Sequence, residues 1–137
     1  MFGLRKNRQI NVVHAYVAAL NARDADRIAS LLSPDVCFVD SRGDAMEGHE
    51  PVMAATRHFL AMEANFAVQV DSTSYHDGDV LLRGRSTADN PDLAKDTLWR
   101  ARVRKGKLSH WQSYGGPEAP ALARLLASKS GLEFKPG

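Results

Sequence analysis

The period of the hydrophobic pattern changes near Asn65, and this change constrains the fold more than any other feature of the sequence. Before it, apolar residues recur every three or four positions, most clearly between residues 9 and 21. From Phe66 onward, apolar and polar residues alternate. A spacing near 3.6 is typical of an amphipathic helix, and a spacing of two is typical of a strand with one buried face. The sequence therefore predicts helices first and a sheet second.

Three helices are predicted in the first half of the chain. The first covers residues 9–21. Its apolar stripe is made of Ile10, Val13, Val17 and Leu20. The second follows Asp24, a suitable N-cap, and is ended by a turn at Ser33-Pro34-Asp35. Its inward side chains are Ile28, Leu31 and Leu32. The third begins around residues 48–51, because proline is well tolerated in a first helical turn. Its buried side carries Val52, Ala55, Thr56, Phe59 and Met62.

Strands make up most of the second half. One short strand, residues 36–40, is predicted earlier, between the second and third helices. Four more strands follow residue 65, joined by tight turns such as Asp77-Gly78 and Lys105-Gly106. These four strands cover residues 66–75, 80–87, 97–104 and 108–114. A short helix over residues 120–128 is predicted to follow them. We expect an α+β domain with helices on one face of a curved sheet, which leaves a hollow at the open end of a cone.

Length and composition are those of one ordinary globular domain. The chain has 137 residues, of which 44% are apolar and 25% charged, and its net charge of +2 gives no reason to expect a nucleic-acid partner. No apolar run approaches the ~20 residues that span a bilayer, and residues 1–6 lack the apolar stretch of a signal peptide. We therefore expect a cytoplasmic protein without a membrane partner. The single domain spans residues 1–137, with its core over about 9–127 and a tail over 128–137.

Metal and nucleotide chemistry find little support in the sequence. Cys37 is the only cysteine, so an internal disulfide and a multi-cysteine zinc site are excluded. The five histidines show no two ligands at a recognised spacing such as His-Glu-x-x-His, and a glycine-rich phosphate loop is missing. We expect no metal and no cofactor. Cys37 is predicted to point away from Asp40 and to be packed and inert.

Asp40 is the most informative single position. Alternation along its strand places it on the same face as Val36 and Phe38, so its carboxylate is expected to face an apolar interior. Desolvation there raises the pKa of the carboxyl group and makes it a suitable general base for taking a proton from carbon next to a carbonyl. The other interpretation is that Asp40 caps the following turn, residues 41–44, in water. The pattern alone leaves both open.

Tyr16 lies within the apolar arc of the first predicted helix. Its hydroxyl therefore needs a partner inside the protein or in a pocket. As a functional group it is suited to donate a hydrogen bond to a developing oxyanion. The alternative is a core tyrosine that is bonded to a backbone carbonyl.

The strand over residues 97–104 has two contrasting faces. Its apolar face carries Trp99, Ala101 and Val103. Its basic face carries Arg100, Arg102 and Arg104, and Arg83 and Arg85 alternate in the same way on the preceding strand. One interpretation is a surface that holds a phosphorylated ligand or an acidic partner. The other is a solvated outer face or a dimer interface, in which the arginines meet Asp71 or backbone carbonyls.

Several segments resemble the nuclear transport factor 2-like superfamily. They are Ala15-Tyr16-Val17-Ala18-Ala19-Leu20-Asn21-Ala22-Arg23-Asp24, Leu31-Leu32-Ser33-Pro34-Asp35-Val36 and Phe38-Val39-Asp40. Two further segments, Gly48-His49-Glu50-Pro51-Val52 and Gly106-Lys107-Leu108-Ser109-His110-Trp111, are similar to the SnoaL-like and ketosteroid isomerase-like branches. The resemblance covers about residues 9–127. It implies a cystatin-like fold, in which a cone-shaped curved antiparallel sheet wraps around three N-terminal helices.

The resemblance also implies roles for particular residues. Tyr16 and Asp40 fall on the positions of the catalytic tyrosine and the proton-shuttling aspartate of ketosteroid isomerases. The sequence departs from that pattern at Trp99, where the second oxyanion acid stands, and at Thr56, where the supporting tyrosine stands. A homodimer through the open face of the sheet is implied as well, and the arginines make that interface polar.

Two functional hypotheses follow. In the first, the chain is an isomerase, cyclase or dehydratase that acts on a small, largely apolar carbonyl compound, with Asp40 as the base and Tyr16 as the oxyanion donor. The pocket is then lined by Phe38, Thr56, Phe59, Trp99 and Trp111. In the second, the chain is a non-catalytic module that binds a ligand or dimerises.

Overall fold

The computed structural model describes residues 2–40, 42–91 and 93–115. Three helices and six strands make up this part of the chain. The helices are α1 (Phe2–Asn21), α2 (Ala25–Leu31) and α3 (His49–Met62). The strands are β1 (Leu32–Val39), β2 (Ala45–Glu47), β3 (Ala67–His76), β4 (Asp79–Thr87), β5 (Lys95–Arg104) and β6 (Lys107–Gly115). The predicted helix over residues 120–128 and the tail lie outside the described residues.

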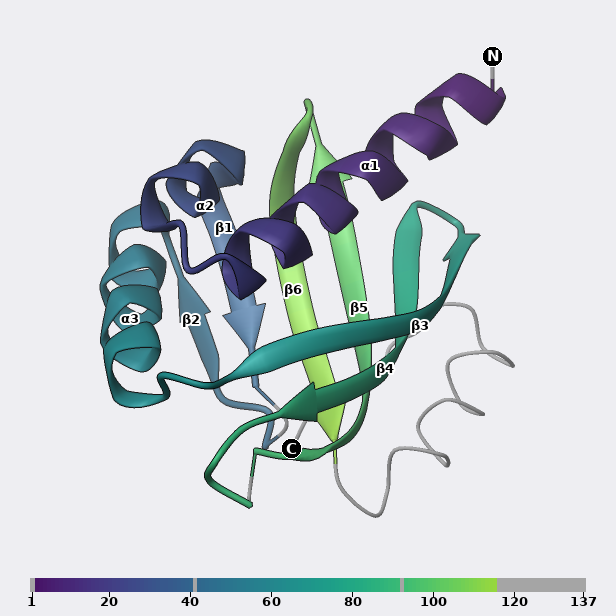
Figure 1. Cartoon of the computed structure of the whole chain (residues 1–137). Helices are drawn as coiled ribbons and strands as arrows, with labels where there is room; N and C mark the ends of the chain where they lie inside the picture. The colour runs from purple at the N-terminus through teal and green to yellow at the C-terminus, as the bar shows by residue number, and fades with distance from the viewer. Residues whose placement is uncertain (1, 41, 92, 116–137) are drawn as a thin grey trace.

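The six strands form one open sheet in the order β2-β1-β6-β5-β4-β3. The strand β1 runs parallel to β6, and the other neighbouring strands are antiparallel. The sheet is therefore mixed: the expected antiparallel arrangement holds for every neighbouring pair of strands except β1 with β6. The sheet curves strongly, and the three helices lie on its inner side (Figure 1). The predicted α+β architecture, with helices on one face of a curved sheet, is confirmed.

Local signals set the helix boundaries. The Asp24 carboxylate accepts a hydrogen bond from the backbone N–H of Arg27 at 3.1 Å, which confirms the predicted N-cap of α2. The helix α3 begins after Gly48, whose φ of +104° is open to glycine and costly for other residues. The helix α1 extends further towards the N-terminus than predicted, because its first two turns carry good helix formers but no regular apolar stripe.

The turn predicted at residues 33–35 is wrong. The backbone becomes extended at Leu32, directly after α2, and residues 33–35 belong to β1. Pro34 disfavours a helical conformation for the residue before it, so the chain passes from helix to strand without a separate turn. The pairing of β1 with β6 is irregular between Leu32 and Cys37, so buried and exposed side chains do not alternate regularly there. The alternation rule therefore predicted too short a strand.

Two further details differ from the sequence-based expectation. Met62 is 63% exposed, because the buried side of α3 consists of Val52, Met53 and Thr56 in its first two turns. The strand β2 was not predicted, because all of its side chains are exposed and it therefore shows no alternation of burial. None of the helices in the described part of the chain is long and apolar enough to cross a lipid bilayer.

The core lies between α1 and the inner face of the sheet. The alternation predicted for β5 is confirmed, since Trp99, Ala101 and Val103 are buried against the helices. The strand β3 bends at a bulge between Val70 and Ser72. Gly84 permits the close approach of β3 at this bend, because a Cβ atom there would overlap the backbone carbonyl oxygen of Gln69.

Candidate functional site

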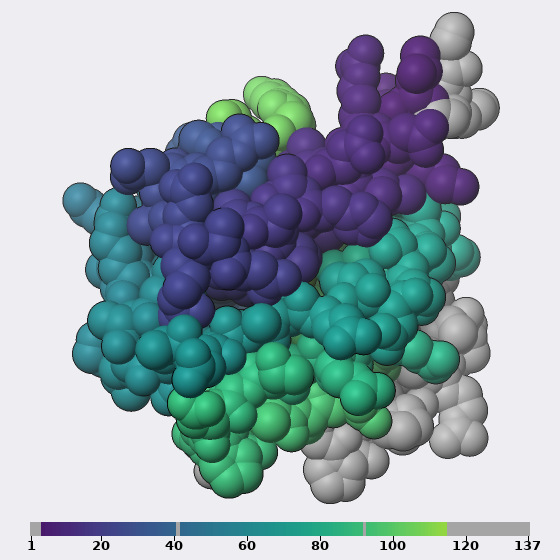
Figure 2. Space-filling view, viewed as in Figure 1, coloured from purple at the N-terminus to yellow at the C-terminus, as the bar shows by residue number. Residues whose placement is uncertain are grey.

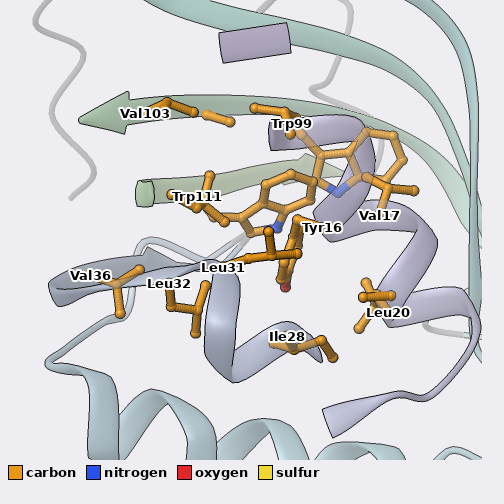
Figure 3. Packing of buried hydrophobic residues seen from close by; sticks show 14 of the residues in the cluster. Tyr16, Val17, Leu20, Ile28, Leu31, Leu32, Val36, Trp99, Val103 and Trp111 are labelled. Atoms are coloured by element: carbon orange, nitrogen blue, oxygen red, sulfur yellow. The ribbon is translucent and has the colours of Figure 1, made fainter. Parts of the chain in front are cut away.

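Tyr16 stands at the centre of a group of aromatic rings inside the cone (Figure 3). Its ring centroid lies 4.9 Å from that of Trp111 and 6.0 Å from that of Phe38, and Trp99 lies 6.1 Å from Trp111. We call these four residues the aromatic cluster. Tyr16, Trp99 and Trp111 are all buried. Three of the residues predicted to line a pocket are therefore brought together around the predicted oxyanion donor.

The Tyr16 side chain is almost wholly buried, and its hydroxyl has no acceptor among the described residues. Tyr16 is 2% exposed, and burial alone raises the pKa of its hydroxyl above the ordinary value. No hydrogen bond joins this hydroxyl to any of the described residues, so the alternative of a tyrosine bonded to a backbone carbonyl is not what these residues form. In Figure 3 the hydroxyl points away from both indole rings.

Asp40 adopts the turn-capping arrangement. It follows the last residue of β1 and is exposed. Its Oδ1 atom accepts hydrogen bonds from the backbone N–H groups of Arg42 at 2.9 Å and Asp44 at 3.0 Å. Its own N–H donates to the carbonyl oxygen of Asp44 at 2.9 Å. Because an Asp carboxylate readily bonds the backbone of a following turn, the chain leaves the strand at Val39. The role of Asp40 as a base stays a prediction.

Thr56 and Phe59 lie on α3, outside the aromatic cluster. The Thr56 hydroxyl is buried and donates to the carbonyl oxygen of Val52 at 2.8 Å within its own helix. The Phe59 ring packs edge-to-face on Phe66 at 4.8 Å. No ring contact joins Phe59 to the aromatic cluster within the described residues.

The arginines of β5 meet a carboxylate that the sequence analysis did not single out. Asp79 is 4% exposed, and its Oδ1 atom lies 3.5 Å from Arg100 Nε and 3.0 Å from Arg102 Nε. Arg102 also donates to the carbonyl oxygen of Asp77, and Arg104 pairs with Asp35. Asp71, the partner considered from the sequence, is not among these contacts. The antiparallel register sets Asp79 opposite Arg102, and only the pairing of β4 with β5 reveals this.

Two other titratable groups lie near this outer face of the sheet. Burial lowers the pKa of His110, and the neighbouring Arg100 lowers it further. Burial raises the pKa of the half-buried Cys37 thiol, and the Glu47 carboxylate adds to this shift. Among residues 2–115, apart from Ser41 and Asp92, no three His, Cys, Asp or Glu side chains are grouped so that they could hold a metal ion.

A groove of about 500 Å³ lies between α1 and β3. It is lined by His14, Val17, Ala18, Asn21, Val68, Val70, Asp71, Ser72 and Thr73. Figure 2 shows α1 and β3 side by side at this surface. The groove was not predicted from the sequence, because most of its helical wall belongs to the polar side of α1 and its strand wall belongs to a distant segment.

Solved structures with the same fold have low sequence identity to this chain. An uncharacterized cystatin fold protein from Novosphingobium aromaticivorans is 24% identical with a TM-score of 0.66, over 75% of this chain and 94% of that one. A hypothetical protein with a ketosteroid isomerase-like fold from Catenulispora acidiphila, in complex with trimethylamine, is 20% identical with a TM-score of 0.67, over 79% and 87%. An LEH-like epoxide hydrolase from M. tuberculosis is 18% identical with a TM-score of 0.71, over 90% and 96%.

These likenesses establish the fold alone, because proteins of this fold carry many unrelated activities. No curated protein sequence is significantly similar to the chain. The family model of the SnoaL-like domain, in contrast, matches residues 13–111, from the middle of α1 to the middle of β6. That stretch contains the aromatic cluster, Asp40 and the whole of the sheet except the end of β6. The chain therefore belongs to the SnoaL-like domain family, within the nuclear transport factor 2-like superfamily.

Proposed function

We propose that this protein binds a small, largely apolar carbonyl compound at the aromatic cluster, with the Tyr16 hydroxyl as the hydrogen-bond donor. The observation that carries the proposal is Tyr16 itself, whose side chain is almost wholly buried and whose hydroxyl has no acceptor among the described residues. Buried polar groups are nearly always paired, and leaving one unpaired costs about 1–3 kcal/mol. A ligand carbonyl supplies the missing acceptor.

The surroundings of Tyr16 favour this class of ligand. Tyr16 belongs to the buried hydrophobic cluster, together with Trp111 and with Ile28 and Leu31 of α2, so a charged ligand there would lose its hydration. A carbonyl oxygen accepts a hydrogen bond without carrying a full charge. Solved structures of the same fold include an LEH-like epoxide hydrolase and a protein co-crystallised with polyporic acid, so this fold holds small organic molecules in other proteins.

Proton transfer is the second candidate, with Asp40 as the base and Tyr16 as the oxyanion donor. It is favoured by the position of Asp40 two residues after Phe38, whose ring contacts that of Tyr16. For this chemistry Asp40 takes up the proton at its Oδ2 atom, because its Oδ1 atom is engaged by two backbone N–H groups. If the protein is instead a non-catalytic module, it binds the ligand without converting it.

The binding experiment uses a phenolic enolate mimic such as equilenin or a substituted naphthol. We expect wild type to bind it in the micromolar range and Tyr16→Phe to bind it about tenfold more weakly or worse. Tyr75→Phe is the matched control, because Tyr75 is a half-buried tyrosine of β3 outside the aromatic cluster. Absence of binding to wild type, or equal binding to Tyr16→Phe, overturns the proposal.

Asp40→Asn separates binding from catalysis. Asparagine keeps an Oδ1 acceptor for the turn amides but cannot take up a proton at neutral pH. If the protein is a proton-transfer enzyme, wild type turns over an enolisable ketone, and Asp40→Asn binds the mimic normally but loses turnover. Turnover that survives Asp40→Asn undiminished rejects Asp40 as the base. Binding without turnover in wild type favours the non-catalytic module.

A further inference from the structure

We propose that the groove between α1 and β3 is a second binding site, and that its ligand is a small molecule carrying a carboxamide group. The groove has a volume of about 500 Å³, which falls in the range of small-molecule sites. It lies at the surface between α1 and the edge strand of the sheet, and none of the aromatic cluster lines it. The proposal is therefore independent of the function proposed for Tyr16.

Asn21 shows which chemical group the edge of β3 accepts. Its Nδ2 atom donates to the carbonyl oxygen of Val68 at 2.8 Å, and its Oδ1 atom accepts from the Val68 N–H, also at 2.8 Å. A side-chain carboxamide thus satisfies both backbone groups of one edge residue, as a neighbouring strand would. This contact forms one end of the groove.

Val70 offers the same pair of backbone groups inside the groove. In an antiparallel strand, the N–H and C=O groups of every second residue point to the same side. Those of Val68 point outward to Asn21, so we infer that those of Val70, which is the last paired residue before the register shift, also point to the free edge. No described side chain forms a hydrogen bond with them. The helix presents Val17 and Ala18 to the groove, and neither side chain has a polar atom.

The ends and the charge of the groove narrow the choice of ligand. At the other end, His14 Nε2 and Thr73 Oγ1 lie 2.9 Å apart, so both ends are bridged from helix to strand. This leaves room for a compact molecule and not for a long added strand. Asp71 lines the groove and has no ion pair among the described residues, so a ligand carboxylate would be repelled. Val17, Val68 and Val70 provide an apolar surface for the rest of the molecule.

Amide hydrogen exchange of the ligand-free protein tests whether the Val70 N–H group lacks a hydrogen-bond partner. We expect the Val70 N–H to exchange at least about tenfold faster than the Val68 N–H, because only the latter is bonded to Asn21. Addition of benzamide is expected to slow exchange at Val70 specifically. If the Val70 N–H is as well protected as that of Val68 in the free protein, the proposal is wrong.

A titration followed by ¹⁵N–¹H chemical shifts tests the ligand. Benzamide is expected to cause saturable shifts at Val70, Ser72 and Ala18, whereas methyl benzoate, which lacks a donor, and benzoate are expected to bind at least about tenfold more weakly. Equal binding of methyl benzoate overturns the proposal. Tighter binding of an extended trivaline peptide overturns the assignment to a small molecule.

Two variants locate the site. Ala18→Leu fills the groove with a residue that favours helix, and it is expected to weaken benzamide binding at least about tenfold. Ala54→Leu, at an exposed position of α3, is the matched control and is expected to leave binding unchanged. Benzamide shifts that persist in Tyr16→Phe exclude binding at the aromatic cluster. Binding that Ala18→Leu leaves unchanged, or that Tyr16→Phe abolishes, contradicts the proposal.

Discussion

The guanidinium of Arg23 donates a hydrogen bond to the carbonyl oxygen of Glu63 at 2.6 Å. The same group reaches the carbonyl oxygens of Leu60 at 2.6 Å and Phe66 at 3.1 Å. Glu63 is the C-cap of α3, and Phe66 directly precedes β3. One side chain therefore connects the end of α1, the end of α3 and the start of the strand that forms the groove. The last carbonyl groups of a helix have no N–H partner within the helix, and Arg23 supplies a donor to those of Leu60 and Glu63.

Arg23→Ala is expected to lower the free energy of unfolding by about 2–3 kcal/mol, because several charge-assisted hydrogen bonds are lost together. Arg27→Ala is the control, since the exposed Arg27 side chain makes no hydrogen bond with a described residue and its loss is expected to cost less than about 0.5 kcal/mol. Urea denaturation of both variants measures the difference. Equal stability of the two variants would show that the Arg23 contacts contribute nothing.

Gly84→Ala is expected to destabilise the protein by about 3 kcal/mol or more. The new Cβ would overlap the backbone carbonyl oxygen of Gln69, and a strand backbone cannot move aside as a flexible side chain can. Gly106→Ala is the comparison, because Gly106 has a positive φ but no atom within 4 Å of the new Cβ. It is expected to cost only about 1–2 kcal/mol, from the backbone conformation. Thermal unfolding that ranks the two variants in the opposite order contradicts this account of the bend in β3.

Tyr16→Phe is expected to leave the stability of the ligand-free protein unchanged within about 0.5 kcal/mol, or to raise it slightly. The substitution removes a hydroxyl that has no acceptor among the described residues and keeps the ring contacts with Phe38 and Trp111. Denaturant unfolding without ligand provides the measurement. A loss of more than about 1.5 kcal/mol would mean that the hydroxyl already has a partner in the folded protein.

Stability is expected to fall on acidification in part through His110. Burial, followed by Arg100, lowers its pKa in the folded state, while Asp79 and Gln112 oppose this shift. As pH falls below about 6.5, the unfolded chain therefore takes up a proton that the folded chain does not, and stability is lost as pH approaches the lowered pKa. His110→Gln is expected to lose less melting temperature than wild type between about pH 7.5 and pH 5. His58→Gln, at an exposed position, is the control and should lose as much as wild type.

The homodimer through the open face of the sheet stays a prediction. Arg83 and Arg85 are exposed on that face, so raised salt is expected to change the affinity of the dimer by screening their charges. Sedimentation equilibrium at two ionic strengths measures the effect. Arg85→Gln is expected to reduce the dependence on salt, and Arg57→Gln on α3 to leave it unchanged. A protein that stays monomeric at every concentration and salt level excludes the dimer.

Local signals account for the parts of the fold that were predicted correctly. Asp24 caps α2 because its carboxylate reaches an N–H group only three residues away. The faces of β5 follow from alternation along one strand, which needs no knowledge of the neighbouring strands. The start of β1 at Leu32 and the strand β2 were not predicted. The strand β1 starts without a preceding turn, and no side chain of β2 is buried.

The candidate site was only partly predictable, because local spacing places a residue on one face of a helix or strand but does not identify its distant partners. Tyr16 lies on the buried side of α1, and its position in the apolar stripe was sufficient to place it in the core. Asp40 had two possible arrangements, and the choice depended on where β1 ends and on the path of the turn that follows. Asp79 became the partner of Arg100 and Arg102 only through the register of β4 with β5.

The sequence by itself determined the order of the three helices and of the strands other than β2, the buried face of β5 and the burial of Tyr16, because these depend on the spacing of apolar residues and on capping over a few positions. The tertiary structure decided which distant segments meet. It set β1 parallel to β6, paired Asn21 with Val68, and formed the groove between α1 and β3. These contacts join residues far apart in the chain, so they depend on strand register and on the curvature of the whole sheet, which no local pattern encodes.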